Sequence, residues 1–176
     1  MIVALVGLCG AGKSEASKYF EDKNFANVYF GGITMEELEK RGLEINEQNE
    51  RKVREGLREE YGMAAYAVLS LPKIKNALEN KKNVLIDGLY SWSEYKVLKK
   101  EFPDIKVISI YTLPELRYKR LAIRPKRSLS KEQAVSRDYS EIENLEKGGP
   151  ISIADVTVLN NGTIDELIDK IKGIFE

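Results

Sequence analysis

Gly7-Leu8-Cys9-Gly10-Ala11-Gly12-Lys13-Ser14 is the stretch that decides the fold, because it is a complete G-x-x-x-x-G-K-[ST] phosphate-binding loop. The apolar run 2–6 before it has the length of a buried strand, and a helical pattern follows it. In such a loop the backbone N–H groups surround a phosphate, the lysine reaches the β- and γ-phosphates, and the hydroxyl binds Mg²⁺. We therefore expect all eight residues to bind nucleotide phosphates and Ser14 to be a Mg²⁺ ligand.

Length and net charge limit the number of domains and the classes of partner. The chain has 176 residues, which fits one compact domain, and its 28 basic and 28 acidic residues leave no net charge. We therefore expect neither nucleic acid nor a membrane as a partner. The apolar runs are too short to span a membrane, and no secretory signal is expected because Met1 leads directly into the first strand.

The only cysteine, Cys9, lies inside the phosphate loop and excludes an internal disulfide framework, which is typical of the reducing cytoplasm. A small residue filling space under the loop is a better interpretation of Cys9 than a redox switch. The chain also lacks histidine, so Asp, Glu and Lys remain for proton transfer and a zinc site is disfavoured.

Short apolar runs alternate with helical patterns along the chain, which predicts an α/β fold with a parallel sheet covered by helices on both faces. After the first strand, the expected strands are 28–30, 84–86, 105–111 and 156–159. Capping boxes predict that helices begin at Thr34, Ser91, Thr112, Ser130 and Thr163.

Residues 34–81 contain no convincing strand and predict helices, among them 46–61 and 63–80, with Pro72 as a kink or break in the second. We therefore expect a single domain, 1–176, with a helical acceptor-binding lobe at about 31–82. A break is expected at 148–150, where two glycines precede a proline.

Asp87 stands at the end of the expected strand 84–86, and the carboxyl ends of parallel strands are where such sheets bind ligands. An acid there can bind Mg²⁺ or accept the proton of a phosphoryl acceptor. The alternative is an aspartate that begins a turn with Gly88.

The segment 117–137 concentrates positive charge. It carries one acid, Glu132, and eight basic residues: Arg117, Lys119, Arg120, Arg124, Lys126, Arg127, Lys131 and Arg137. Because arginines stabilise the charge that develops during phosphoryl transfer, we interpret about 117–140 as an arginine-rich lid. A solvated helix face is an alternative, above all for Arg117 and Lys119. A nucleic-acid patch fits poorly because few aromatic residues are interleaved.

Arg51, Arg54 and Arg58 share one face of the expected helix 46–61. They could bind an acceptor or pair with neighbouring glutamates, and the pattern does not choose between the two.

These motifs resemble the nucleoside-monophosphate-kinase branch of P-loop kinases, and are closest to the adenylate-kinase-like, dephospho-CoA kinase-related family. The resemblance runs nearly from end to end through the loop and five further motifs: Leu57-Arg58 with Tyr61-Gly62, Ile86-Asp87-Gly88, Arg117 to Arg124, Arg137-Asp138 with Glu141, and Ala154-Asp155 leading to Asn160-Asn161-Gly162. It implies a five-stranded parallel sheet in the order 2-3-1-4-5, an acceptor lobe between strands two and three, and a lid. It also implies adenine recognition near Arg120 and the loop 160–163, which includes Asn161.

The sequence departs from that family where the acceptor binds. Adenylate-kinase-like enzymes carry an acid and an arginine after the second strand and an arginine after the Asp-Gly, where this chain has 31–35 and Leu89-Tyr90. Arg41, Arg54 or Arg58 would have to replace these arginines. Dephospho-CoA kinases carry a catalytic aspartate after strand two, which is absent here, so that activity is less favoured.

The resulting hypothesis is an ATP- and Mg²⁺-dependent kinase of a small, nucleotide-like acceptor. Lys13 would hold the β- and γ-phosphates, Ser14 and Asp87 would bind Mg²⁺, and Arg124 and Arg127 would close over the transferring group. Arg54, Arg58 and Asp87 would bind the acceptor.

Two alternatives remain. One is transfer to dephospho-CoA or another pantetheine-like acceptor, with Asp87 taking the proton. The other is a non-catalytic ATP-dependent switch; a GTPase is disfavoured because the guanine signature N-K-x-D and a D-x-x-G after the third strand are both missing. The acceptor and the oligomeric state are left open.

Overall fold

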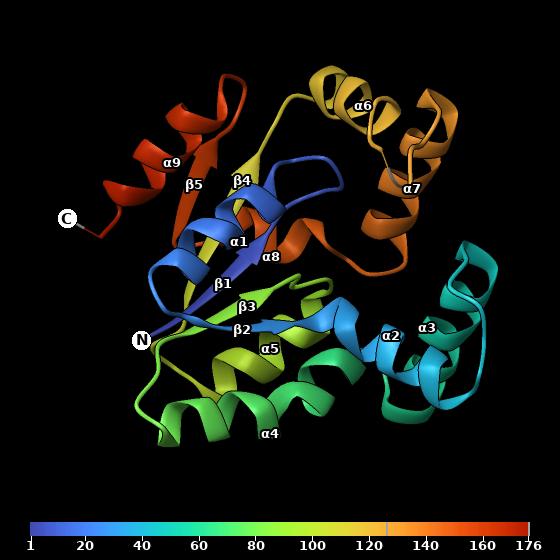
Figure 1. The fold of residues 1–176 in the computed structure, drawn as a ribbon, viewed down its shortest axis with the longest axis horizontal. Helices are drawn as coiled ribbons and strands as arrows, with labels where there is room; N and C mark the ends of the chain where they lie inside the picture. The colour runs from blue at the N-terminus through green and yellow to red at the C-terminus, as the bar shows by residue number, and fades with distance from the viewer. Residues whose placement is uncertain (126, 176) are drawn as a thin grey trace.

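Five parallel strands form one sheet in the order β2-β3-β1-β4-β5, as the family resemblance implies (Figure 1). This computed structural model describes residues 1–125 and 127–175, apart from the side chain of Glu47, so Lys126 of the basic segment lies outside the described residues. The strands are β1 (Ile2–Val6), β2 (Ala26–Tyr29), β3 (Val84–Asp87), β4 (Lys106–Tyr111) and β5 (Val156–Leu159).

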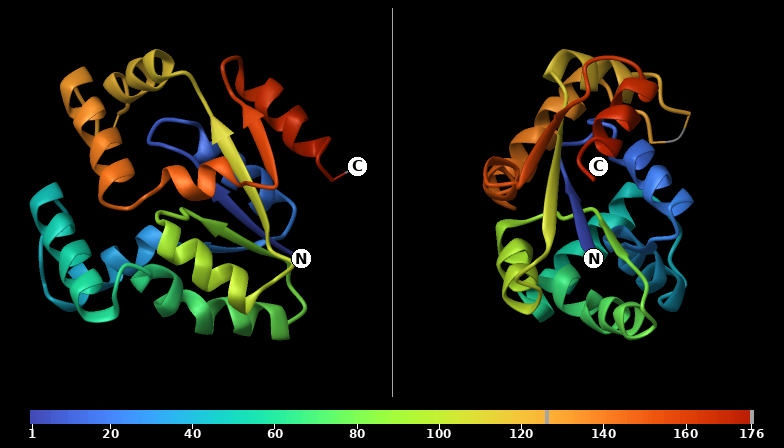
Figure 2. Two further views of the ribbon diagram at one scale, coloured as in Figure 1. Left: turned by 180° about the vertical axis from the view of Figure 1, so that it is seen from behind. Right: turned by 90° about the vertical axis from the view of Figure 1, so that its left-hand side faces the viewer.

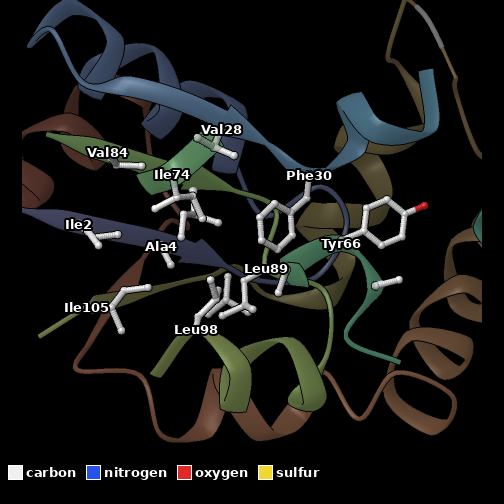
Figure 3. Packing of buried hydrophobic residues seen from close by; sticks show 14 of the residues in the cluster. Ile2, Ala4, Val28, Phe30, Tyr66, Ile74, Val84, Leu89, Leu98 and Ile105 are labelled. Carbon is white, nitrogen blue, oxygen red and sulfur yellow. The ribbon is translucent and has the colours of Figure 1, made fainter. Parts of the chain in front are cut away.

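Helices cover both faces of the sheet, because the buried side chains of β1 alternate between the two faces. On one face Val3 and Leu5 pack with α1 (Lys13–Asp22) and α9 (Ile164–Lys172). On the other, Ile2 and Ala4 belong to the core that includes α4 (Ala65–Glu79) and α5 (Trp92–Glu101), with α8 (Gly148–Ser152) packed against it (Figures 2 and 3).

Two helical pairs extend from the carboxyl ends of the strands, where ligands bind in sheets of this kind. One pair is α2 (Phe30–Lys40) with α3 (Glu47–Tyr61), and the other is α6 (Pro114–Ala122) with α7 (Lys131–Glu143). Both pairs lie on the same side of the molecule in Figures 1 and 2. Of the expected lobe at 31–82, α2 and α3 stand away from the sheet, whereas α4 packs onto it through Ile74.

Three capping boxes predict helix starts correctly, because the Ser91, Ser130 and Thr163 side chains each accept a hydrogen bond from the backbone N–H three residues on. The other two predictions are wrong. At the expected second strand, Phe30 instead begins α2, so Thr34 lies inside the helix and its hydroxyl is 2.6 Å from that of Tyr66. Thr112 is not the N-cap of α6 either, since Leu113 holds that position ahead of Pro114.

Two expected breaks are not found. Helix α4 continues through Pro72, so of the predicted kink or break the break is wrong, and the residues 148–150 belong to the short helix α8.

Candidate active site

Tight packing shapes the phosphate loop between β1 and α1. Gly7, Gly10 and Gly12 adopt φ values of 150°, 80° and 104°, which favour glycine. A Cβ at Gly12 would also collide with the side-chain amide of Asn160, so glycine is required there for both reasons. The loop therefore holds the curled backbone that phosphate binding needs.

Lys13 lies inside this curl. Its ammonium donates hydrogen bonds to Gly7 O at 2.7 Å and to Leu8 O at 3.2 Å. Burial, with a further contribution from the charge of Lys147, lowers the pKa of Lys13 to about 8. The ammonium is thus poised at the loop, while Ser14 is exposed on the first turn of α1.

Asp87 is brought to the loop by the sheet. The parallel pairing of β1 with β3 sets Asp87 opposite Leu5, two residues before the loop begins. Burial raises the pKa of Asp87, and the nearby Ser17 hydroxyl and the charge of Lys13 oppose that rise. The predicted pair of Lys13 and Asp87 therefore shares one site, and Ser17 is an addition that the sequence did not single out.

Two segments that are distant in sequence, at the ends of β4 and β5, bind the backbone of the phosphate loop. The Thr112 hydroxyl donates to Ala11 O at 3.0 Å, and the Asn160 amide donates to the same oxygen at 2.8 Å. These bonds fix the loop to the ends of β4 and β5.

Arg117 is a structural residue. It is 3% exposed, makes a bidentate ion pair with Asp138 at 2.9 and 2.6 Å, and donates to Cys9 O at 3.1 Å. The alternative of a solvated helix face at Arg117 is therefore wrong, because its guanidinium connects α6 to α7 and to the phosphate loop. The local charge pattern did not distinguish it from its exposed neighbour Lys119.

The residues assigned to adenine binding meet at the loop 160–163. Arg120 donates to Gly162 O at 3.3 Å, and the Asn161 side chain accepts a hydrogen bond from Leu113 N at 3.0 Å. The start of α6 and the loop after β5 are thereby joined beside the phosphate loop.

The two lid arginines that were predicted to close over the transferring group, Arg124 and Arg127, lie between α6 and α7. Arg124 is exposed, and Arg127 forms an ion pair with Glu50 of α3. Glu50 is 6% exposed and also pairs with Arg54 at 3.3 Å. This carboxylate therefore joins the basic segment to the helical lobe.

The three arginines on one face of α3, Arg51, Arg54 and Arg58, lie in different environments. Arg51 pairs with Glu55 at 2.8 Å on the surface, which matches the alternative of pairing with neighbouring glutamates. Arg58 instead lies over the Tyr66 ring at 5.3 Å, and its Nε is buried without a hydrogen-bond partner within the part of the chain that the structure describes.

Glu94 is a buried acid beside this arginine. Its Oε2 accepts hydrogen bonds from Tyr90 N at 2.7 Å and Ser91 N at 3.0 Å, whereas its Oε1 is buried and unpartnered among the described residues. Burial raises the pKa of Glu94 to about 7, and the charge of Arg58 opposes the rise. The capping box located Glu94 but gave no sign of this burial.

Lys147 also reaches the site without a sequence signal. Its ammonium donates to Glu141 at 2.7 Å and lies 5.3 Å from the centre of the Tyr90 ring. Although burial opposes ionisation, the charges of Lys147 and Arg137 lower the pKa of Glu141 to about 2.

The donor set fits Mg²⁺ bound together with phosphate. Magnesium in phosphate-loop sites takes one or two protein oxygens and completes its shell with phosphate oxygens and water. Ser14 and Asp87 supply such oxygens, and within residues 1–125 and 127–175 no cluster of three or more His, Cys, Asp or Glu could hold a metal unaided. None of the helices described is both long enough and apolar enough to cross a membrane.

Known proteins share this architecture. A family model described as an AAA domain matches residues 3–146. A UPF0200 protein of Thermococcus gammatolerans is 37% identical over 180 residues, covering 100% of this chain and 94% of its own. Two solved structures are similar in fold, each at 21% sequence identity. A shikimate kinase from Aquifex aeolicus has a TM-score of 0.60, and the match covers 99% of this chain and 96% of that one. A dephospho-CoA kinase from Campylobacter jejuni has a TM-score of 0.58, and the match covers 98% of this chain and 96% of that one.

Proposed function

The chain belongs to the AAA-domain family of P-loop proteins and to the UPF0200 family, and from this premise we propose that it transfers the γ-phosphoryl group of ATP to a small, nucleotide-like acceptor. The observation that carries the proposal is the joint placement of Lys13 and Asp87 at adjacent strand ends, under a basic segment that contacts a helical lobe. A donor site and an acceptor site are both needed for transfer, and this arrangement supports the assignment of the phosphate loop to the donor and of the helical lobe to the acceptor.

The donor half would be the phosphate loop. Its N–H groups and Lys13 would hold the β- and γ-phosphates, so the ammonium would exchange its bonds with Gly7 O and Leu8 O for bonds with phosphate oxygens. Arg120 and Asn161 would flank the adenine. When bound, Mg²⁺ neutralises phosphate charge, and Ser14 and Asp87 would hold it.

The acceptor half would lie between α3 and β3. Arg54 and Arg58 would bind the acceptor, while Asp87, which would hold Mg²⁺ through water, would receive the proton of the attacking hydroxyl. Arg124 and Arg127 would close over the transferring group, and Arg127 would leave Glu50 to do so. Catalysis would come from positioning and charge stabilisation. The free thiol of Cys9 fits a reducing cytoplasm.

ADP release in the presence of ATP and Mg²⁺ tests this function. A panel of nucleoside monophosphates and dephospho-CoA would be compared for the wild type, Lys13→Ala and Lys18→Ala, the last an exposed lysine on the same helix. We expect one acceptor class to accelerate release, Lys13→Ala to abolish it, and Lys18→Ala to preserve it.

Acceleration by dephospho-CoA alone would move the assignment to pantetheine-like acceptors. Thermal stabilisation by ATP, without accelerated hydrolysis or transfer for any acceptor, would replace the kinase with a binding module. Unchanged turnover in Lys13→Ala would refute the assignment of the donor site.

A further inference from the structure

Lys147 is 1% exposed, which is unusual for a lysine, since a buried ammonium is costly unless it is paired. Glu141 is its carboxylate partner at 2.7 Å. An ammonium has three N–H donors, and the bond to Glu141 uses one. The Tyr90 ring, at 5.3 Å, covers another side of the charge.

Contacts connect Lys147 to the phosphate loop. Its partner Glu141 lies one turn beyond Asp138 on α7. Asp138 pairs with Arg117, whose guanidinium donates to Cys9 O of the loop. Lys147 therefore brings a buried ammonium close to the loop that carries Lys13.

Lys147 also interacts with the acceptor side of the site. Its charge acts on Glu94, the buried acid beside Arg58, and its ring partner Tyr90 follows Asp87 by three residues. Lys147 thus influences both the phosphate loop and the residues next to the lobe.

The backbone around Lys147 is fixed. Its N–H donates to Glu141 O at 3.2 Å, and Trp92 N donates to Leu145 O at 3.1 Å. Gly149 lies so close to Trp92 that an added Cβ would be 2.8 Å from the indole ring. The ammonium is therefore presented from a rigid support, as an electrostatic group of an active site requires.

We propose that Lys147 is a phosphate-binding cation of the transfer site, held by Glu141 and Tyr90 until phosphoryl oxygens enter between it and Lys13. This inference rests on the proposed function and deepens it, because it names one cation in place of the arginines that are missing after β2 and β3. The phosphoryl oxygens could belong to the γ-phosphate of ATP or to a phosphate of the acceptor.

Calorimetric titration separates these two sources. ATP, ADP, and inorganic phosphate added to the ADP-bound protein would be titrated into the wild type, Lys147→Met, Lys147→Arg and the control Lys100→Met, an exposed lysine of α5. Trp92, the chain's only tryptophan, offers a second readout because it contacts Gly149. Loss of one charge-assisted bond predicts at least about tenfold weaker binding.

If Lys147 binds the γ-phosphate, Lys147→Met weakens ATP by at least about tenfold and ADP by less than about twofold. If it binds the acceptor's phosphate, the loss falls on inorganic phosphate in the ADP-bound protein. In both cases Lys147→Arg recovers most of the affinity and Lys100→Met resembles the wild type. Affinities within about twofold for all three probes in Lys147→Met would overturn the proposal and leave a purely structural ion pair.

Glu141→Gln keeps the proposal testable if Lys147→Met does not fold. Removing the competing carboxylate frees the Lys147 ammonium, so ATP and inorganic phosphate should bind as tightly as in the wild type or more tightly. Weaker binding of both would overturn the proposal. Because these titrations measure binding, a wild type that binds ATP but transfers phosphate to no acceptor would refute the kinase and leave the Lys147 assignment open to the same test.

Discussion

Replacing Arg117 with Met should destabilise the protein far more than a change at an exposed ion pair. The substitution removes both bonds to Asp138, at 2.9 and 2.6 Å, and those to Thr112 O and Cys9 O, at 3.2 and 3.1 Å. It also leaves Asp138, which is 7% exposed, without its cation. Breaking a buried pair in this way costs about 3–5 kcal/mol. For a chain of this size that lowers the melting temperature by about 6–20 °C.

Urea unfolding at pH 7, followed by circular dichroism, measures the change in the free energy of unfolding. The control is Lys18→Met, which breaks the exposed pair of Lys18 and Glu15 and should cost at most about 0.5 kcal/mol. The double variant Arg117→Met/Asp138→Leu should recover part of the loss, because it removes the carboxylate that has lost its cation. A cost below about 1 kcal/mol for Arg117→Met, or a double variant whose cost equals the sum of both single costs, would refute the reasoning.

Three further predictions concern charges at the site. Lys13→Met should abolish the thermal shift caused by ATP. The melting temperature of the free protein at pH 7 should be unchanged or higher, because burial lowers the pKa of Lys13 to about 8 and makes the charged ammonium unfavourable at pH 7. A lower melting temperature would contradict this. Burial raises the pKa of Glu94 from 4.5 to about 7, so the stability linked to its protonated form is present below pH 4.5 and lost as the pH rises through 7. From pH 5 to pH 8 the urea midpoint of unfolding should therefore fall more in the wild type than in Glu94→Gln. Equal falls would rule this out. Glu50→Gln should weaken the contact of Arg127 with α3 and speed tryptic cleavage between α6 and α7. The effect should reach at most about fivefold, because the Arg127 side chain is 57% exposed and its ion pair is therefore weak. An unchanged cleavage rate would show that Glu50 does not hold this segment.

Much of the fold follows from local sequence. Alternating apolar strands and helical patterns predict a covered parallel sheet, and the capping boxes at Ser91, Ser130 and Thr163 work because donor and acceptor lie three residues apart. The same pattern fails at Thr34 and Thr112. There the hydroxyls bond to groups 32 and 101 residues away, and no local rule contains those partners.

The donor site illustrates the same division. The sequence by itself determined the phosphate loop and pointed to Asp87, because a motif fixes Lys13 and Ser14 locally and a strand end marks the ligand-binding edge of a parallel sheet. Only the tertiary structure separated buried Arg117 from its exposed neighbour Lys119 and brought Lys147 and Glu94 together around Tyr90. The physical reason is that burial and ion pairing are set by the packing of α5, α7 and α8 against the strand ends, which joins residues that no spacing in the chain relates.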